Sequence, residues 1–407
     1  MTIARSIETR ESWVVATVAL VVLTMSYGAP MVTVVALKPI AAEFGTDRSA
    51  PAMAISLTYL GAGLGGIAMG WLAERIGTRV VVVGCGAMIA IGMVLASMGG
   101  LWMLWACNFL LIGLIGSAGM FAPLMTYVTR WFDRRRGSAV ALISSGQYVA
   151  GALWPSVFQL GIDWTGWRTT MLVFGIAVAV IILPAAAIFF RAPPEQPVMT
   201  GADINGHAST SLGMPSWLAM TMLAGAVFCC CVTMSMPQAH LVAMCSDIGI
   251  GAASGAVMLS VLLGSAFVSR QFWGWLSDRV GGLPTILYAS AGQAIAMVGF
   301  LLTQDEVALF TVAAVFGLGF GGLIPGYVLA IRDLFPASEA GWRIPMVLFP
   351  GSVGMAAGGW IAGEMYDVYG YYGPGFAVGV LANIVNLMLI AALVIRHRTR
   401  RSVMVMA

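Results

Sequence analysis

Long runs of apolar residues, separated by short polar stretches, fill the chain of 407 residues. A helix crosses a hydrocarbon core of about 30 Å with roughly 20 mostly apolar residues. Twelve runs of about that length occur, at residues 13–37, 52–72, 80–98, 101–128, 138–160, 169–190, 217–244, 252–276, 284–302, 307–331, 345–365 and 373–395. The pattern therefore predicts an all-α membrane protein with twelve transmembrane helices.

The middle of the chain carries its only long polar stretch, which has the Pro, Gly and Ser content of a linker. On either side of it the sequence repeats, because GWLAERIGTR begins at Gly70 and GWLSDRVGG begins 204 residues later at Gly274. We therefore predict two pseudo-symmetric six-helix bundles, residues 1–190 and 216–407, joined by a cytoplasmic linker over residues 191–215. Transporters built from parallel repeats bind their substrate between such halves.

Composition and charge agree with this class. Only 9% of residues are charged, whereas soluble chains carry about a quarter. Lys38, Arg48 and Arg168 fall on one side of the predicted membrane, and sixteen other arginines fall on the opposite side. The positive-inside rule then places both termini in the cytoplasm. The first apolar run is too long for the apolar core of a signal peptide, so we expect none. The net charge of +3 follows from topology and gives no indication of nucleic-acid binding.

The sequence offers little for an enzyme. The six cysteines lack the spacing of a metal site, and five of them lie in predicted spans as small packing residues. Neither a phosphate-binding G-x-x-x-x-G-K-[ST] motif nor a catalytic Ser/His/Asp set is present at membrane depth. We expect no catalytic residues, metal or cofactor.

Arg270 is the one charge within the interior of a predicted span, in the run VLLGSAFVSRQFWGWL. A charge at membrane depth costs several kcal/mol unless it is paired or hydrated, so such residues commonly face a substrate pathway. The planar guanidinium matches a carboxylate with paired N–H donors. We therefore predict that Arg270 binds an organic anion. The alternative is an arginine whose long side chain reaches the cytoplasmic surface from near the helix end.

The two repeated motif copies resemble the signature loop of the major facilitator superfamily, and the resemblance covers the whole chain. It implies the two-bundle fold of that superfamily and a cytoplasmic gate in which the acids meet helix N-termini and the arginines pair across the face. We also expect the motif glycines to permit close helix approach. The predicted gate residues are Gly70, Glu74, Arg75, Arg79, Gly274, Asp278 and Arg279.

Further motifs resemble the monocarboxylate transporter and oxalate–formate antiporter group, including its bacterial branch. They are SYGAP from Ser26, RWFDRRRGSAVAL from Arg130, HLVAMCSDIG from His240 and SRQFWGWLSDR from Ser269. The resemblance places Arg270 at the substrate-binding arginine of that group. Met31 and Ala266 stand where animal members carry a lysine and an aspartate, and Lys38 is the only lysine in the chain. A single fixed positive charge favours a monoanion over a dianion.

Other residues complete the predicted site. Phe121 and Phe320 stand where tyrosine is common in the group, which suits a substrate with an apolar body. With Arg270, the candidate substrate-binding residues are Tyr27, Tyr59, Phe121, Gln147, Phe320 and Asn383. The polar ones among them serve equally well in hydrogen bonds between helices. Asp247 and His240 are the candidate proton carriers, or else ordinary outer-loop residues. Glu364 and Asp367 are interpreted as outer-surface charges.

The predicted function is secondary active transport of a small organic monocarboxylate by alternating access, coupled to protons in symport. The alternative is a proton-driven exporter or an anion exchanger for another amphipathic compound. The expected partners are the organic anion, protons and the lipid bilayer, with no nucleic acid, and a monomer is expected. We predict a multi-pass protein of the plasma membrane, the bacterial inner membrane.

Overall fold

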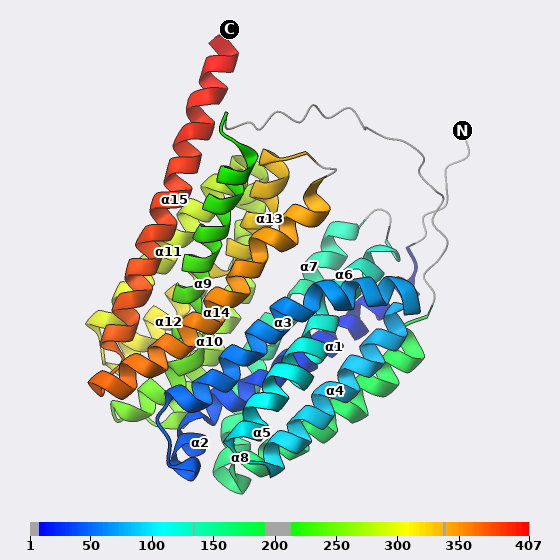
Figure 1. The fold of residues 1–407 in the computed structure, drawn as a ribbon, viewed down its shortest axis with the longest axis vertical. Coiled ribbons are helices and arrows are strands. Elements are labelled where there is room, and N and C mark those ends of the chain that lie inside the picture. The colour runs from blue at the N-terminus through cyan, green and yellow to red at the C-terminus, as the bar shows by residue number, and fades with distance from the viewer. Residues whose placement is uncertain (1–7, 133–134, 192–212, 337–338, 407) are drawn as a thin grey trace. The chain divides into compact units, whose positions relative to one another are not determined.

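The computed structural model describes residues 8–132, 135–191, 213–336 and 339–406, and these are almost entirely helical (Figure 1). The Cα positions group into two compact units. Unit 1 comprises Met1–Thr46 and Met53–Met199, and unit 2 comprises Asp47–Ala52 and Thr200–Ala407. Most of the predicted linker, residues 192–212, lies outside the described residues, as do Asp133 and Arg134 of the motif that begins at Arg130.

Unit 1 is a bundle in which α8 packs along α1 and α4. Its helices are α1 (Arg10–Val35), α2 (Leu37–Phe44), α3 (Ser49–Ile76), α4 (Thr78–Met98), α5 (Leu101–Ala106), η1 (Cys107–Gly116), η2 (Ser117–Gly119), α6 (Phe121–Thr129), α7 (Arg136–Ser144) and α8 (Gly146–Phe189). The first residues of α3 group with unit 2. The segment η1 is a π-helix, in which each backbone hydrogen bond joins residues five positions apart and not four as in an α-helix.

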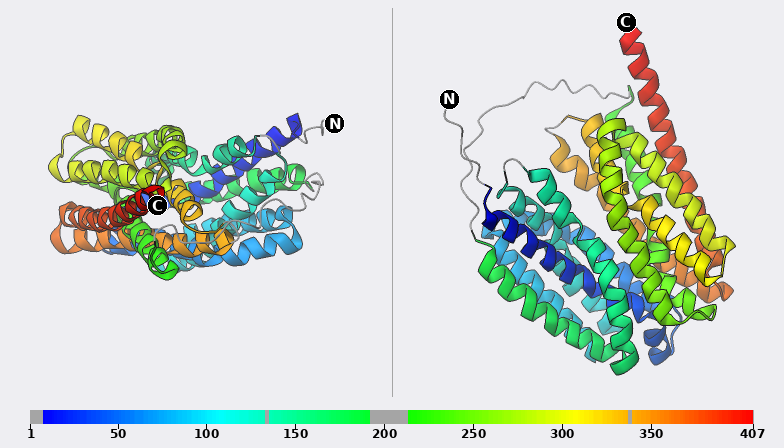
Figure 2. Two further views of the ribbon diagram at one scale, coloured as in Figure 1. Left: turned by 90° about the horizontal axis from the view of Figure 1, so that it is seen from above. Right: turned by 180° about the vertical axis from the view of Figure 1, so that it is seen from behind.

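Unit 2 is a bundle built around α9, which packs against α10, α14 and α15. Its helices are α9 (Ser216–Asp247), α10 (Ala252–Val280), α11 (Gly282–Leu302), α12 (Glu306–Phe320), α13 (Leu323–Leu334), α14 (Ala340–Tyr369) and α15 (Gly373–Met406). The C-terminal end of α15 runs beyond the neighbouring ends of α9 and α11 in both side views (Figures 1 and 2).

Every predicted span has a helical counterpart, although the divisions differ. Within the described part of the chain, nine helices are long and apolar enough to cross a membrane, or ten if the bent pair in α3 is one span. The runs 138–160 and 169–190 are joined into one long helical stretch, in which Gly166 has a non-helical conformation. The run 101–128 is divided among α5, η1, η2 and α6. Hydropathy locates apolar runs but does not distinguish a continuous helix from one broken at a glycine.

The backbone carries the same repeat as the motifs. Three pairs of glycines with positive φ lie 204 residues apart: Gly45 with Gly249, Gly77 with Gly281 and Gly166 with Gly370. Helices α4 and α11 also begin and end 204 residues apart. Glycine is favoured at positive φ because it has no Cβ. The two halves therefore have the same backbone conformation at these positions, with a constant spacing of 204 residues.

Close helix approach occurs at a fourth matched pair of glycines, Gly113 and Gly317. A Cβ added at Gly113 of η1 would lie 2.7 Å from the Thr58 carbonyl oxygen of α3, and one added at Gly317 of α12 would lie 2.0 Å from the Leu262 carbonyl oxygen of α10. Around Gly113 the contact is strengthened by the Thr58 hydroxyl, which donates to Asn108 over 2.9 Å. These glycines let backbones touch.

Replacing Gly317 by alanine is expected to lower stability by about 1–3 kcal/mol or more, because the added methyl meets backbone that cannot move aside. Thermal unfolding of the detergent-solubilised protein measures the change. Gly84→Ala is the matched control, since a Cβ at Gly84 of α4 meets nothing within 4 Å and alanine favours helix over glycine. Equal melting temperatures for Gly317→Ala and Gly84→Ala would contradict the close contact.

Candidate functional site

Arg270 lies well inside α10. It follows the start of the helix at Ala252 by eighteen residues, or about 27 Å, and precedes the end at Val280 by about 15 Å. The preceding residue, Ser269, is buried against α12, where its hydroxyl lies 3.2 Å from the Gly317 carbonyl oxygen. Arg270 itself is half-buried. The packing of Ser269 thus fixes the rotation of α10 about its axis, and with it the direction in which Arg270 leaves the helix.

The other predicted substrate-binding residues are placed as follows. In unit 1, Tyr27 of α1, Tyr59 of α3 and Gln147 of α8 are half-buried, and Phe121 at the start of α6 is 39% exposed. In unit 2, Phe320 is buried and its ring packs 5.5 Å from that of Phe316.

Asn383 has a different environment from these residues. It is fully buried in α15, and its side-chain amide donates to Gln293 of α11 over 2.9 Å. This contact favours the interhelical role that the sequence left open for Asn383.

Asp247 at the end of α9 is bound by Arg48. Both terminal nitrogens of the Arg48 guanidinium donate to the carboxylate, one to each oxygen, and the second of these bonds is 2.7 Å long. The two side chains are only 14% and 17% exposed. The guanidinium also lies over the Tyr366 ring, 4.0 Å from its centre. Burial alone would lower the pKa of Arg48, but its hydrogen bonds to Asp247 and Tyr372 raise that pKa above the ordinary value, so the guanidinium stays charged.

Asp367 holds the backbone at the same place. Its two carboxylate oxygens accept the backbone N–H groups of Arg48 (2.8 Å) and Ser49 (2.7 Å), at the start of α3. A carboxylate at a helix N-terminus satisfies backbone donors and interacts favourably with the helix dipole. Asp367, interpreted from the sequence as an outer-surface charge, is thus a half-buried cap for residues 48 and 49.

His240 joins the same group through Tyr372. The imidazole is completely buried, with Nε2 2.7 Å from the Gly359 carbonyl oxygen and Nδ1 3.4 Å from the Tyr372 hydroxyl. A carbonyl oxygen only accepts, so Nε2 carries the hydrogen, and Nδ1 of the neutral ring accepts from Tyr372. Tyr372 in turn accepts from Arg48 over 3.0 Å. Burial raises the pKa of Tyr372, so its hydroxyl remains protonated. We call Asp247, Arg48, Tyr372 and His240 the outer network.

Unit 1 contains a matched cluster with a different arrangement of charges. Glu43, which stands 204 residues before Asp247, accepts from Arg168 (2.6 Å) and from Trp167 (2.5 Å). Arg168 stands 204 residues before Tyr372. In the first half, the acid Glu43 is therefore paired with Arg168 of the same half. In the second half, the position that corresponds to Arg168 is occupied by Tyr372. Asp247 is instead paired with an arginine from position 48.

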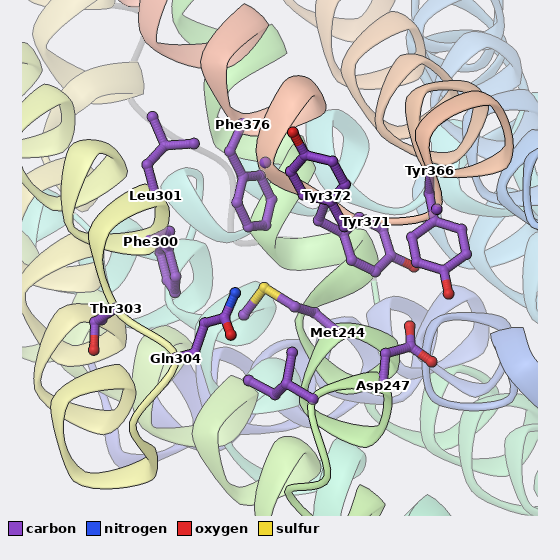
Figure 3. A pocket seen from close by; sticks show the side chains of 13 residues that line it. Met244, Asp247, Phe300, Leu301, Thr303, Gln304, Tyr366, Tyr371, Tyr372 and Phe376 are labelled. Carbon is purple, nitrogen blue, oxygen red and sulfur yellow. The ribbon is translucent and has the colours of Figure 1, made fainter.

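A pocket of about 290 Å³ opens beside the outer network (Figure 3). The C-terminal ends of α9, α11 and α14, the loops that follow them and the start of α15 form its wall. The wall includes Asp247, Phe300, Gln304, Tyr366, Tyr371 and Tyr372. In Figure 3 the Asp247 carboxylate lies at one edge, beneath Tyr366 and Tyr371. Water and small solutes that enter this pocket reach Asp247, while His240 stays buried behind Tyr372.

The repeated gate motifs form local contacts within each helix. The Arg75 guanidinium lies 3.9 Å from the Trp71 ring, and that of Arg279 lies 3.7 Å from the Trp275 ring, one helical turn earlier in each case. Glu74 and Arg79 are exposed, and the side chain of Asp278 is outside the described part of the structure.

The structure shows open space at the motif glycines. A Cβ at Gly70 or Gly274 would meet no described atom within 4 Å. Close contact falls instead on Gly113 and Gly317.

Comparison with known proteins identifies the family. A profile of the Major Facilitator Superfamily matches residues 17–304 and 221–403. The chain belongs to the major facilitator superfamily. The predicted superfamily and fold are thus confirmed, and this member is a membrane transporter and not an enzyme.

Two relatives and one crystal structure extend the comparison. The rat protein named monocarboxylate transporter 13 is 27% identical over 320 residues, which cover 75% of this chain and 71% of that protein. Human monocarboxylate transporter 11 is 25% identical over 400 residues, covering 92% and 74%. A bacterial homologue of the human lysosomal transporter Spinster, inward-facing and unoccupied, has a TM-score of 0.74 at 15% identity and covers 97% of this chain and 98% of that one. That likeness concerns the fold alone.

In this major facilitator, sequence reasoning found Asp247 and His240 but not the residues that connect them. Arg48 was read only as a basic residue on the outer side, and Tyr372 was not singled out. A signal was present, because aligning the halves at the 204-residue spacing sets Tyr372 against Arg168 and leaves Asp247 without an arginine of its own half. Among the residues that the structure covers, no group of three His, Cys, Asp or Glu side chains could hold a metal ion.

Proposed function

We propose that this transporter moves a small organic monocarboxylate across the membrane by alternating access, together with a proton. The observation that carries the proposal is a half-buried arginine, Arg270, deep within the apolar helix α10. A charge at that depth is expensive unless it is paired or hydrated, and such residues commonly face a substrate pathway. The names of the two mammalian relatives agree with a carboxylate as the bound group.

In this proposal the Arg270 guanidinium binds both carboxylate oxygens through its paired N–H donors. The organic body of the substrate contacts Tyr27, Tyr59, Phe121, Gln147 and Phe320, whose side chains are mostly apolar. We give Asn383 a supporting role in the packing of α15, because its amide is already bonded to Gln293. A mostly apolar lining with few polar groups suits a carboxylate that carries a hydrophobic or aromatic body.

We propose Asp247 as the first proton carrier. The carboxylate borders a pocket, so it can exchange protons with water, and its present partner is a charged guanidinium. Protonation of Asp247 would remove its negative charge, so the ion pair with Arg48 would be lost. His240 is the second candidate, since Tyr372 links it to Arg48 by hydrogen bonds.

The proposed location is the bacterial inner membrane. The charge distribution supports cytoplasmic termini, and the repeated motifs then lie on the cytoplasmic side as the gate. That gate comprises Gly70, Glu74, Arg75, Arg79, Gly274, Asp278 and Arg279. Each half contributes a stacked Trp–Arg pair to it.

Uptake into liposomes tests the proposal. Purified protein is reconstituted and offered a panel of labelled monocarboxylates, with and without an inward proton gradient. At least one should accumulate above its external concentration only when the gradient is present. Accumulation of no monocarboxylate, or accumulation of an organic cation instead, would overturn the proposed substrate class. Exchange without net accumulation would identify an anion exchanger.

The same assay also measures whether the transporter distinguishes singly from doubly charged anions. Because Arg270 is the one arginine or lysine within the interior of the predicted spans, unlabelled monocarboxylates should compete with the transported substrate. Oxalate, doubly charged at neutral pH, should compete at least about tenfold less well, since its second carboxylate would remain uncompensated in a low-dielectric site. Competition by oxalate equal to that of a monocarboxylate of similar size would contradict the single-charge site.

A further inference from the structure

Unit 2 has a second pocket, of about 370 Å³, at the end opposite the outer network. It lies where α10, α13 and α15 approach their C-terminal ends and α11 begins. Its wall includes four residues with polar side chains, Arg279, Asp333, His397 and Arg398, together with Gly281 and Gly282. The pocket is separate from the site proposed for the substrate, because Arg270 does not line it.

The length of α15 sets the depth of this pocket in a bilayer. His397 follows the start of the helix at Gly373 by 24 residues, or about 36 Å. The hydrocarbon core is about 30 Å thick, and the headgroup layers bring the whole to about 40–45 Å. A helix that enters the core near Gly373 therefore carries His397 and Arg398 into the opposite headgroup layer. Trp275, one turn before Arg279, is 54% exposed, as is usual for tryptophan at that level.

The chemistry of the wall suits a phosphate group. Two arginines, Arg279 and Arg398, line the pocket, and arginine binds phosphate oxygens with paired N–H donors. The N-terminus of α11 adds a favourable dipole. The single acid of the wall, Asp333, accepts the Gly282 N–H over 3.0 Å and so serves as a cap of α11. The His397 Nδ1 atom is buried and bonds to no atom of the described structure.

The surroundings favour a lipid over a soluble phosphate. Val280 is 39% exposed and Ile395 is 65% exposed, so apolar side chains adjoin the basic pocket where acyl chains would follow a headgroup. The described part of the first half is arranged differently at the matching place. Helix α8 ends at Phe189, which matches Leu393 of α15, whereas α15 continues to Met406. The pocket at the matching place in unit 1 is about 80 Å³ and contains the acid Glu74.

We propose that this pocket binds the phosphate of an anionic phospholipid headgroup. Arg279 and Arg398 hold the phosphate oxygens from two sides, and His397 donates or accepts at the inner wall. The bound lipid connects the extension of α15 to α10 and α11. Basic pockets between transmembrane helices on the cytoplasmic side are a known form of lipid recognition. This proposal is independent of the transported substrate.

Lipid titration of the full-length protein tests it. The protein is purified in a neutral detergent, and its thermal unfolding midpoint is followed while phosphatidylglycerol, phosphatidylcholine or inorganic phosphate is added. Phosphatidylglycerol should raise the midpoint with saturation, and phosphatidylcholine should not. Arg398→Gln should require about fivefold more phosphatidylglycerol for half of the effect, which is the usual contribution of one basic residue near an anionic surface. Arg398→Lys should recover part of the loss.

Arg396→Gln is the matched control. It removes the same charge from the same helix two residues away, but Arg396 does not line the pocket and instead contacts the Gly213 carbonyl oxygen. Its titration should be that of the unaltered protein. Equal weakening by Arg396→Gln and Arg398→Gln would show a diffuse surface charge and overturn the site. Equal stabilisation by phosphatidylcholine, or by inorganic phosphate at the same concentration, would overturn the assignment to an anionic lipid.

Discussion

Substituting glutamine for Arg270 is expected to abolish saturable uptake of the monocarboxylate while the protein remains folded. The variant keeps a long polar side chain. It loses the positive charge and the pair of N–H groups that could bind both carboxylate oxygens at once. Losing one partner of a desolvated, hydrogen-bonded charge pair costs about 2–5 kcal/mol, or roughly 30-fold to several thousand-fold in affinity. Arg270→Lys should retain an intermediate affinity, because an ammonium is charged but lacks the planar fork.

The control for this experiment is Arg332→Gln, which makes the same change at an exposed residue near the end of α13. Uptake kinetics and a melting curve are recorded for each variant. A folded Arg270→Gln protein with an unchanged KM would exclude Arg270 as the carboxylate ligand. In that case the arginine would be one that extends to the cytoplasmic surface along α10.

Asp247→Asn is expected to uncouple transport from the proton gradient. Substrate should still equilibrate and exchange across the membrane at equal pH, but an imposed gradient should no longer drive accumulation. Because the substitution leaves the charged Arg48 without its acid in a mostly buried place, the single variant will lose stability. The double variant Asp247→Asn with Arg48→Gln removes both charges and should recover stability without recovering coupling.

Glu43→Gln is the matched control, since Glu43 occupies the equivalent place in the first half and bonds to Arg168. That pair is a third or more exposed on each side, so its loss should cost no more than about 1 kcal/mol and leave coupling intact. His240→Gln is measured in parallel for a shift in the pH optimum of uptake. If Asp247→Asn and His240→Gln both concentrate substrate as the unaltered protein does, neither residue carries the proton.

The helical framework was predictable because the lipid core offers no hydrogen-bond partners to the backbone. Each apolar run must satisfy its own N–H and C=O groups, so it becomes a helix. The run 217–244 thus corresponds to Ser216–Asp247, and the run 80–98 to Thr78–Met98. The run 101–128 was harder, since nothing in its hydropathy indicates the π-helical bonding at Cys107–Gly116.

The outer network was only half predictable. Asp247 and His240 are polar residues near the end of an apolar helix, and that pattern is visible in the sequence. Their connection depends on Arg48 and Tyr372, which are 324 positions apart and meet only in the folded chain. The capping role of Asp367 was missed for the same reason, since a carboxylate that caps a distant helix start resembles any acid near a span end.

The position of Arg48 also affects how this transporter can be recombined with its relatives. The linker between the halves is the natural crossover point for a chimera, and the constant 204-residue spacing suggests that the halves are interchangeable parts. A crossover at the linker, however, takes Asp247 and Asp367 from one parent and residue 48 from the other. A chimera intended to keep the second half intact therefore needs residues 47–52 transplanted with it, although they lie in the first third of the polypeptide.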